Sequence, residues 1–245
     1  MNLKLINRLN QLGNVLQNRE DCIALLALGS CADLERMDDY SDLDFFVIVE
    51  KDKQDKYLYH LDWLEECAPL AYTFRNTKDG HKIMWEDGIY AEYAVFEIDQ
   101  LHDIPFSKGN FIFKKDGYPL SSSPIVKYPI LNQTTDYAIN EILTNLYVGL
   151  CRYRRGEHLS AFRLIQVHAI DRILAMNRNE MDTDKFSYDR RVEFNHPELV
   201  PLLESSILGY SNIIESSRNI LEYIKTITEL NPMMVHEIER LIDNN

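Results

Sequence analysis

The segment L-A-L-G-S-C-A-D-L-E-R-M-D-D-Y-S-D-L-D-F-F-V-I-V, residues 26–49, decides the fold of this chain. The apolar runs at residues 25–28 and 45–49 have the length and composition of buried strands. A Gly-Ser pair follows the first run, and Asp42 and Asp44 open the second. The segment therefore predicts two strands joined through a tight turn, the second of which begins with two carboxylates.

The two carboxylates of Asp42 and Asp44 are placed to bind one cation. Side chains alternate along a strand with period two, so these two share a face, roughly 6.6 Å apart along the axis. Mg²⁺ prefers oxygen ligands and is usually held by one or two protein carboxylates together with substrate phosphates. An Asp-x-Asp also occurs by chance in acidic chains, and residues 38–42 could form a solvated loop that caps the strand. Combined with the Gly-Ser pair and the apolar run behind it, the pattern favours a metal site.

The Gly-Ser pair supplies the other half of a phosphate site. Gly29 has no Cβ, so its backbone can approach a phosphate closely. We expect a helix over residues 32–37, whose free N–H groups and positive dipole end would point at the same phosphate. Ser30 adds a hydroxyl donor. Gly29 and Ser30 are therefore the candidate phosphate-binding residues.

This pattern resembles the signature of the nucleotidyltransferase superfamily of the DNA polymerase β type. That signature is an apolar residue, Gly, then Gly or Ser, about a dozen variable positions, and then Asp, an apolar residue, Asp or Glu, and another apolar residue. Here Leu28-Gly29-Ser30 is followed after eleven residues by Asp42-Leu43-Asp44-Phe45. The resemblance is closest to the bacterial antibiotic nucleotidyltransferases that act on lincosamides and aminoglycosides.

The resemblance implies an α+β fold, in which a small mixed β-sheet with flanking helices is followed by an all-helical C-terminal domain. We expect the catalytic domain over residues 1–120 and the helical domain over 133–245, because prolines and serines interrupt regular structure between them. The resemblance also implies a nucleoside triphosphate as co-substrate and two Mg²⁺ ions.

Two-metal phosphoryl chemistry uses a third carboxylate, which binds the second ion or takes the proton from the attacking hydroxyl. In the family this residue lies on a later strand, and Glu92 is the candidate here, as both base and ligand. Glu92 stands in the run G-I-Y-A-E-Y-A-V-F-E, where an acidic side chain is costly to bury without a partner. Two alternatives stay open: Glu92 faces solvent, or Glu97 at the end of the run is the third carboxylate.

Apolar spacing predicts the elements around this centre. An amphipathic N-terminal helix is expected, with an apolar stripe formed by Leu5, Ile6, Leu9, Leu12, Val15 and Leu16. A second helix is expected over residues 53–67. Strands are expected over 70–74, 81–86, 89–96 and, at an edge, 111–113. Helices are expected over 139–150 and 159–176, and one or two more within 201–230, where Ile207 is expected to face inward.

The helical half carries a basic cluster. Arg152 and Arg155 could neutralise a triphosphate through charge-assisted, bidentate hydrogen bonds. The alternative, a basic helix end that complements its own dipole, has equal weight. Further along, Arg163 and His168 match the R-x4-H pattern of the HEPN ribonucleases. Five residues of α-helix turn through about 500°, which leaves the two roughly 140° apart, so we interpret His168 as structural.

Composition favours a compact intracellular protein. The 245 residues are 45% hydrophobic, enough for a sizeable core. With 39 acidic and 26 basic residues the net charge is −13, which argues against broad nucleic-acid binding and would attract a cationic acceptor. The four cysteines form no C-x-x-C pair, which indicates reduced thiols. No apolar segment is long enough to span a membrane, so we predict a cytoplasmic protein without membrane association.

Together these features predict Mg²⁺-dependent transfer of a nucleoside monophosphate from a nucleoside triphosphate to a hydroxyl of a small molecule, with release of pyrophosphate. The expected acceptor is an antibiotic such as a lincosamide or an aminoglycoside, and a second copy of the chain is a further candidate partner. Two other classes of function stay open. One is a catalytically silent nucleotide-binding module, and the other is a protein AMP-transferase or a component of a toxin–antitoxin system.

Overall fold

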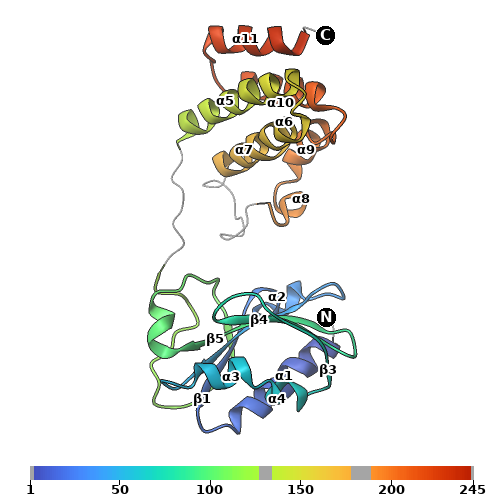
Figure 1. The fold of residues 1–245 in the computed structure, drawn as a ribbon. Helices are drawn as coiled ribbons and strands as arrows, with labels where there is room; N and C mark the ends of the chain where they lie inside the picture. The colour runs from blue at the N-terminus through green and yellow to red at the C-terminus, as the bar shows by residue number, and fades with distance from the viewer. Residues whose placement is uncertain (1–2, 127–133, 178–188, 244–245) are drawn as a thin grey trace. The chain divides into compact units, whose positions relative to one another are not determined.

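The computed structural model describes residues 3–126, 134–177 and 189–243. The chain divides into two compact units, Met1–Pro129 and Ile130–Asn245 (Figure 1). The first unit contains a six-stranded sheet with helices, and the described part of the second is helical. The predicted α+β fold class is confirmed. No helix within the described ranges is long and apolar enough to cross a membrane.

The sheet is mixed, with the strand order β3-β4-β5-β2-β1-β6. Its strands are β1 (Cys22–Ala27), β2 (Leu43–Val49), β3 (Leu70–Arg75), β4 (Gly80–Trp85), β5 (Tyr90–Glu97) and β6 (Asn110–Lys114). The β2–β5 pair is parallel and the other neighbouring pairs are antiparallel. The strands predicted from the apolar runs are confirmed to within a few residues, including β6 at an edge.

The middle of the sheet is buried on both faces. Helix α1 (Leu3–Gln17) packs on one face with α3 (Gln54–Tyr59) and α4 (Asp62–Glu65), and its predicted apolar stripe contributes to that core. Residues after β5, including Leu101 and Phe106, cover part of the other face. Strand β1 is buried along its whole length because its side chains alternate between these two cores. The second cover ends before the start of β2 and β5, which leaves Asp44 and Glu92 partly exposed.

The expectation of a single helix over residues 53–67 is wrong, because the chain forms two short helices, α3 and α4, with a break at His60 and Leu61. Trp63 lies in the core, and its indole N–H donates to the carbonyl of Tyr57 at 3.2 Å. That bond ties the two short helices together across the break, and the buried indole therefore decides how the chain turns here.

The second unit contains two long helices, α5 (Thr135–Arg154) and α10 (Ile213–Ile227), and a C-terminal helix α11 (Pro232–Asp243) that the sequence pattern did not reveal. Shorter elements connect them: α6 (His158–Phe162), η3 (Arg163–Ala169), α7 (Ile170–Asn177), α8 (Val192–Asn195), η4 (Pro197–Leu199) and α9 (Val200–Ser206). The expectation that Ile207 faces inward is wrong. It lies just after the end of α9 and is 49% exposed.

The segment η3 is a π-helix, which changes the argument about Arg163 and His168. Hydrogen bonds in a π-helix run from residue i to i+5, so residues five apart lie closer to one face than in an α-helix. The separation of about 140° expected for an α-helix therefore does not apply. His168 Nδ1 lies 3.9 Å from the carboxylate of Asp171 on the protein surface, and its structural role stays a prediction.

Candidate functional site

Four side chains from four neighbouring strands form a row on the open part of the sheet. Asp44 on β2 is in register with Glu92 on β5, Glu92 with Lys82 on β4, and Lys82 with Phe74 on β3. Residues that pair across neighbouring strands point to the same face, about 4.8 Å apart from strand to strand. The row lies on the face opposite to α1, α3 and α4, whose core holds the alternate residues of the same strands. The predicted pair Asp44 and Glu92 is thus brought together by the fold.

Asp42 lies one residue before β2 rather than in it. Its charge contributes to the raised pKa of Tyr90, the residue two positions before Glu92. Partial burial and the hydrogen bond to Glu92 raise the pKa of Tyr90. A cleft of about 390 Å³ opens beside Asp42 and Tyr90, and α1 and the loop before β2 form its walls. Asp42 therefore borders a cleft on the side of α1, whereas Asp44 belongs to the strand row.

The Gly-Ser turn is held directly against the aspartate strand. The N–H of Leu28 donates to the carbonyl of Asp44 at 2.8 Å, and the thiol of Cys31 lies 3.4 Å from the carbonyl of Asp42. Gly29 has φ = +53°, and a Cβ added to it would stand 3.0 Å from Oδ2 of Asp44. Ser30 is half-buried beside it. Only glycine fits this position without strain, because both the backbone angle and the neighbouring carboxylate exclude a side chain.

The helix expected over residues 32–37 is wrong. Helix α2 spans only Gly29–Ala32, and a separate 3₁₀ turn, η1, covers Leu34–Arg36. The side chain of Asp33 accepts a hydrogen bond from the N–H of Glu35 at 3.3 Å, a local bond that competes with helix formation. A helix of one turn has little macrodipole, so any phosphate contact at this turn would come from Gly29 and its neighbouring N–H groups.

Glu92 has partners that the sequence analysis missed. Its Oε1 lies 2.8 Å from Nζ of Lys82 and accepts the hydroxyl of Tyr90 at 2.9 Å. The side chains of Glu92 and Lys82 are each 37% exposed, so the expected buried position is wrong in degree. The hydrogen bond and the charge of Glu92 raise the pKa of Lys82. The hairpin that pairs Lys82 with Glu92 has a three-residue connection, residues 86–88, in which Gly88 has a positive φ of 83°.

The other candidate for the third carboxylate, Glu97, acts as a helix cap. It accepts the N–H of Asp52 at 2.9 Å and forms a capping box with Gln100 at the start of the 3₁₀ helix η2 (Ile98–His102). Glu97 also lies at the end of β5, five residues beyond Glu92. Its position and its partners favour a structural role.

The carboxylates on the open part of the sheet are the candidates for holding a hard cation. Asp42 and Asp44 offer carboxylate oxygens beside the Gly29 turn, which is the ligand type that Mg²⁺ prefers. Across residues 3–126, 134–177 and 189–243, no three His, Cys, Asp or Glu side chains are grouped so that they could hold a metal ion. Glu92 is instead engaged by an ammonium group. The structure therefore gives Glu92 the ammonium group of Lys82 as its partner, and the assignment of Asp42 and Asp44 as ligands stays a prediction.

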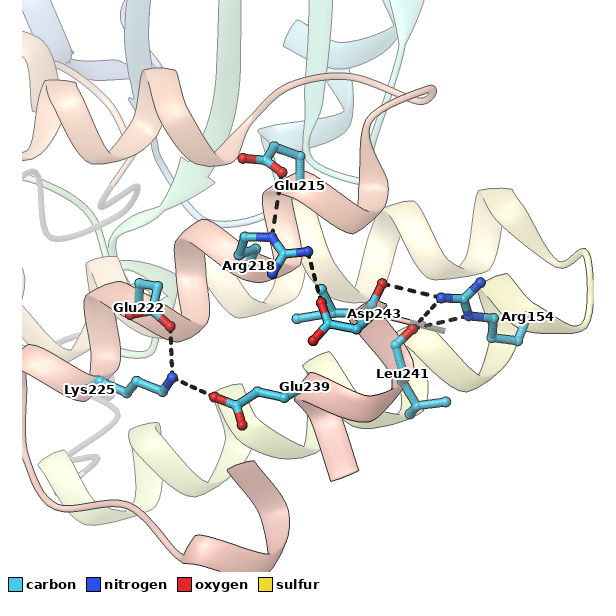
Figure 2. A network of polar contacts seen from close by, with 9 residues as sticks. Arg154, Glu215, Arg218, Glu222, Lys225, Glu239, Leu241 and Asp243 are labelled. Atoms are coloured by element: carbon cyan, nitrogen blue, oxygen red, sulfur yellow. Dashed lines mark hydrogen bonds and ion pairs between the residues drawn. The ribbon is translucent and has the colours of Figure 1, made fainter. Parts of the chain in front are cut away.

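The arginines of the helical unit are bound within that unit. Arg152 bonds to the hydroxyl of Ser160, and Arg155 lies 3.2 Å from the carboxylate of Glu157. Arg154 donates to the carbonyl of Leu241 near the end of α11 (Figure 2). These contacts favour the structural alternative over triphosphate binding.

Ion pairs tie the last two helices of this unit together. Arg218 on α10 lies 3.1 Å from Asp243, and Lys225 lies 2.7 and 2.8 Å from Glu222 and Glu239 (Figure 2). Most of these side chains are partly exposed, so each pair contributes little on its own. The network holds α11 against α10.

No family model matches this chain, and no curated protein matches it in sequence. Among solved structures, it is similar to an aminoglycoside 6-adenyltransferase from Bacillus subtilis, at 13% identity and a TM-score of 0.37, over 96% of both chains. It is also similar to a nucleotidyltransferase-like protein from Exiguobacterium sibiricum, at 11% identity and a TM-score of 0.35, over 95% of this chain and 74% of that one.

A third similar structure is a STING-associated CdnE c-di-GMP synthase from Capnocytophaga granulosa, at 15% identity and a TM-score of 0.33, over 98% of this chain and 80% of that one.

Proposed function

We propose that this chain is a nucleotidyltransferase, which transfers a nucleoside monophosphate from a nucleoside triphosphate to a hydroxyl of a small molecule and releases pyrophosphate. The observation that carries this proposal is the register of Asp44 with Glu92 on parallel strands, with the Gly29 turn packed against Asp44. A phosphate-binding turn, a pair of aspartates and a further carboxylate then lie side by side on one face.

The Gly29 turn would bind a phosphate group of the substrate, and the two aspartates would bind the cation that accompanies it. Gly29 leaves the space for a phosphate to meet the backbone, and Ser30 can donate its hydroxyl to the same group. Asp42 and Asp44 would hold a Mg²⁺ ion, which when bound would neutralise charge on the phosphate oxygens. The cleft beside Asp42 gives room for further parts of a substrate.

The reaction is an in-line substitution at the α-phosphorus. The acceptor oxygen forms the new P–O bond, the bond to pyrophosphate breaks, and the proton of the hydroxyl passes to the carboxylate of Glu92. Glu92 lies one strand spacing, about 4.8 Å, from Asp44. A base in that place would be next to the phosphoryl group that Asp42 and Asp44 position.

The acceptor would approach over β4 and β3, on the far side of Glu92 from the Gly29 turn. Phe74 and Tyr72 there are each 51% exposed, and Met84 beside them is 37% exposed. Such a strip can cover the apolar face of a ring. An acidic chain attracts cationic molecules, so aminoglycosides and lincosamides are the first acceptors to examine.

The test is to incubate the protein with each of the four α-³²P-labelled ribonucleotides, Mg²⁺ and a panel of these antibiotics. Pyrophosphate release and the mass of the labelled product are then measured. Label on a small molecule supports the proposal. Label on a polypeptide would indicate an AMP-transferase acting on proteins, and binding of nucleotide without pyrophosphate release would indicate a silent binding module.

A further inference from the structure

The contact between Lys82 and Glu92 bears on the number of metal ions in the site. Resting on the proposed function, we propose that the site takes one divalent cation, at Asp42 and Asp44, and that the ammonium group of Lys82 stands where a second cation would otherwise bind Glu92. Lys82 is then a positioning residue that holds Glu92 and supplies a permanent positive charge on the acceptor side.

The geometry of the hairpin places this charge. Lys82 and Glu92 are directly paired across β4 and β5, and Nζ lies 2.8 Å from Oε1. The hydroxyl of Tyr90 donates to the same oxygen at 2.9 Å. Two donors therefore converge on one oxygen of Glu92, in the place where a bound cation would need it. Because the pairing is between neighbouring strands of a sheet, it does not depend on a loop that could move away.

Electrostatics decides between the ammonium group and a second ion. A dication bound to Glu92 would lie within a few ångströms of Nζ of Lys82, and like charges at that distance repel strongly even near the protein surface. A second ion could bind only after the Lys82 side chain had turned away from Glu92 and lost its ion pair. That cost weakens binding of a second ion. Asp42 and Asp44 lie on the other side of Glu92 from Lys82, so their cation site is not excluded in this way.

Lys82 suits the role of a replacement cation. An ammonium group is a compact point charge with three donors. Those of Lys82 interact with Glu92 and with the hydroxyl of Tyr90, which leaves one for a further oxygen. The acceptor hydroxyl would arrive beside Glu92, so negative charge that develops on its oxygen during attack would be near Nζ. The bonds that form and break are the same as in the proposed reaction, and the proton still passes to Glu92.

The number of bound ions tests this inference without relying on turnover. Free Mn²⁺ is measured by electron paramagnetic resonance during titration of the full chain, with and without the non-hydrolysable analogue α,β-methylene-ATP. We expect one Mn²⁺ per chain for the wild type, for Lys82→Arg and for Glu92→Gln, since Glu92 is not a ligand. In Lys82→Met, which frees Glu92, we expect a second ion to bind at least tenfold more tightly than in the wild type.

Lys78→Met is the matched control, because Lys78 lies in the β3–β4 connection with 87% of its side chain exposed, and it should bind one ion like the wild type. Circular dichroism checks that each variant is folded. Two ions in the wild type, loss of the ion in Glu92→Gln, or a single ion in Lys82→Met would each overturn the inference and leave the proposed function standing. No ion in the wild type would overturn both.

Discussion

Gly29 and Asp44 lie in direct contact, so that a Cβ atom on Gly29 would stand 3.0 Å from Oδ2 of Asp44. The contact joins the turn after β1 to the strand β2 that carries the aspartates, and the hydrogen bond from Leu28 to Asp44 reinforces it. Position 29 is therefore sensitive to substitution for two separate reasons, its left-handed backbone and the carboxylate beside it.

We expect Gly29→Ala to weaken nucleotide binding at least tenfold while the fold is retained. The new methyl group would push the carboxylate of Asp44 away from its place, in addition to about 1–2 kcal/mol of backbone strain. Titration with a fluorescent nucleoside triphosphate analogue measures the affinity. Gly117→Ala is the control, because Gly117 also has a positive φ, +86°, but has nothing within 4 Å of the added Cβ. Equal affinities in the two variants would contradict a special role for Gly29.

Asp42→Ala and Asp44→Ala should each abolish transfer, by roughly a thousandfold or more, with the fold intact. Each removes a cation ligand that contributes several kcal/mol of transition-state stabilisation. Rates of pyrophosphate release measure the effect. Asp33→Asn is the comparison, since it lies in the same segment and keeps a side chain that can bond the N–H of Glu35. Activity within about tenfold of wild type in either alanine variant would rule out the cation site.

The strands of the sheet could be predicted because their signals are local. The apolar runs around Leu26 and Val47 mark β1 and β2, and the turn at Asp87 and Gly88 sets the pairing of β4 with β5. The short helices could not be predicted in the same way. Their ends depend on tertiary contacts, such as the buried indole of Trp63, and on local side-chain bonds, such as that of Asp33.

The site could be predicted only in part. Asp42, Asp44 and Gly29 stand in one segment, so their proximity follows from the sequence. The register of Glu92 with Asp44 joins strands that are not consecutive, and no local signal sets the register of such a parallel pair. Lys82 and Phe74 enter the site through the same sheet order. They carry no motif of their own and become visible only when the strands are placed side by side.

The substitution Glu92→Gln tests whether Glu92 is the general base of the reaction. The substitution keeps the size of the side chain and loses the proton acceptor, so nucleotide affinity should survive while turnover falls by roughly 10²- to 10⁴-fold. Single-turnover rates and nucleotide titrations, made on the same preparations, give the two quantities. A Glu97→Gln variant should retain full turnover, because Glu97 caps η2. Normal turnover in Glu92→Gln would show that another group takes the proton.

The buried imidazole of His81 should make the free energy of unfolding depend on pH. It is 6% exposed, its Nδ1 lies 3.2 Å from the hydroxyl of Tyr93, and burial followed by the charge of Arg75 lowers its pKa. The unfolded chain therefore protonates His81 at a higher pH than the folded chain does. The contribution of neutral His81 to the free energy of unfolding is complete above about pH 6.5 and is lost as the pH falls below that value. Urea unfolding between pH 7.5 and 5.5 should show this loss, and His81→Phe should reduce it. The same slope in both proteins would exclude His81 as its source.

We expect a substitution of Phe74 to weaken binding of the acceptor without changing binding of the nucleotide. Phe74 lies at the end of the row that starts with Asp44, two strand spacings or about 10 Å from Glu92, a distance that a molecule of one or two rings can span. We expect Phe74→Ala to raise the KM for a ring-bearing acceptor about tenfold, which corresponds to the loss of about 1.4 kcal/mol of contact with the ring. Thr73→Ala is the matched control, because Thr73 is exposed on the same strand and points to the opposite face. Light scattering, measured in parallel, reports the oligomeric state. A changed oligomeric state in Phe74→Ala, or an equal change of KM in both variants, would show that the exposed side chains of β3 and β4 do not bind the acceptor.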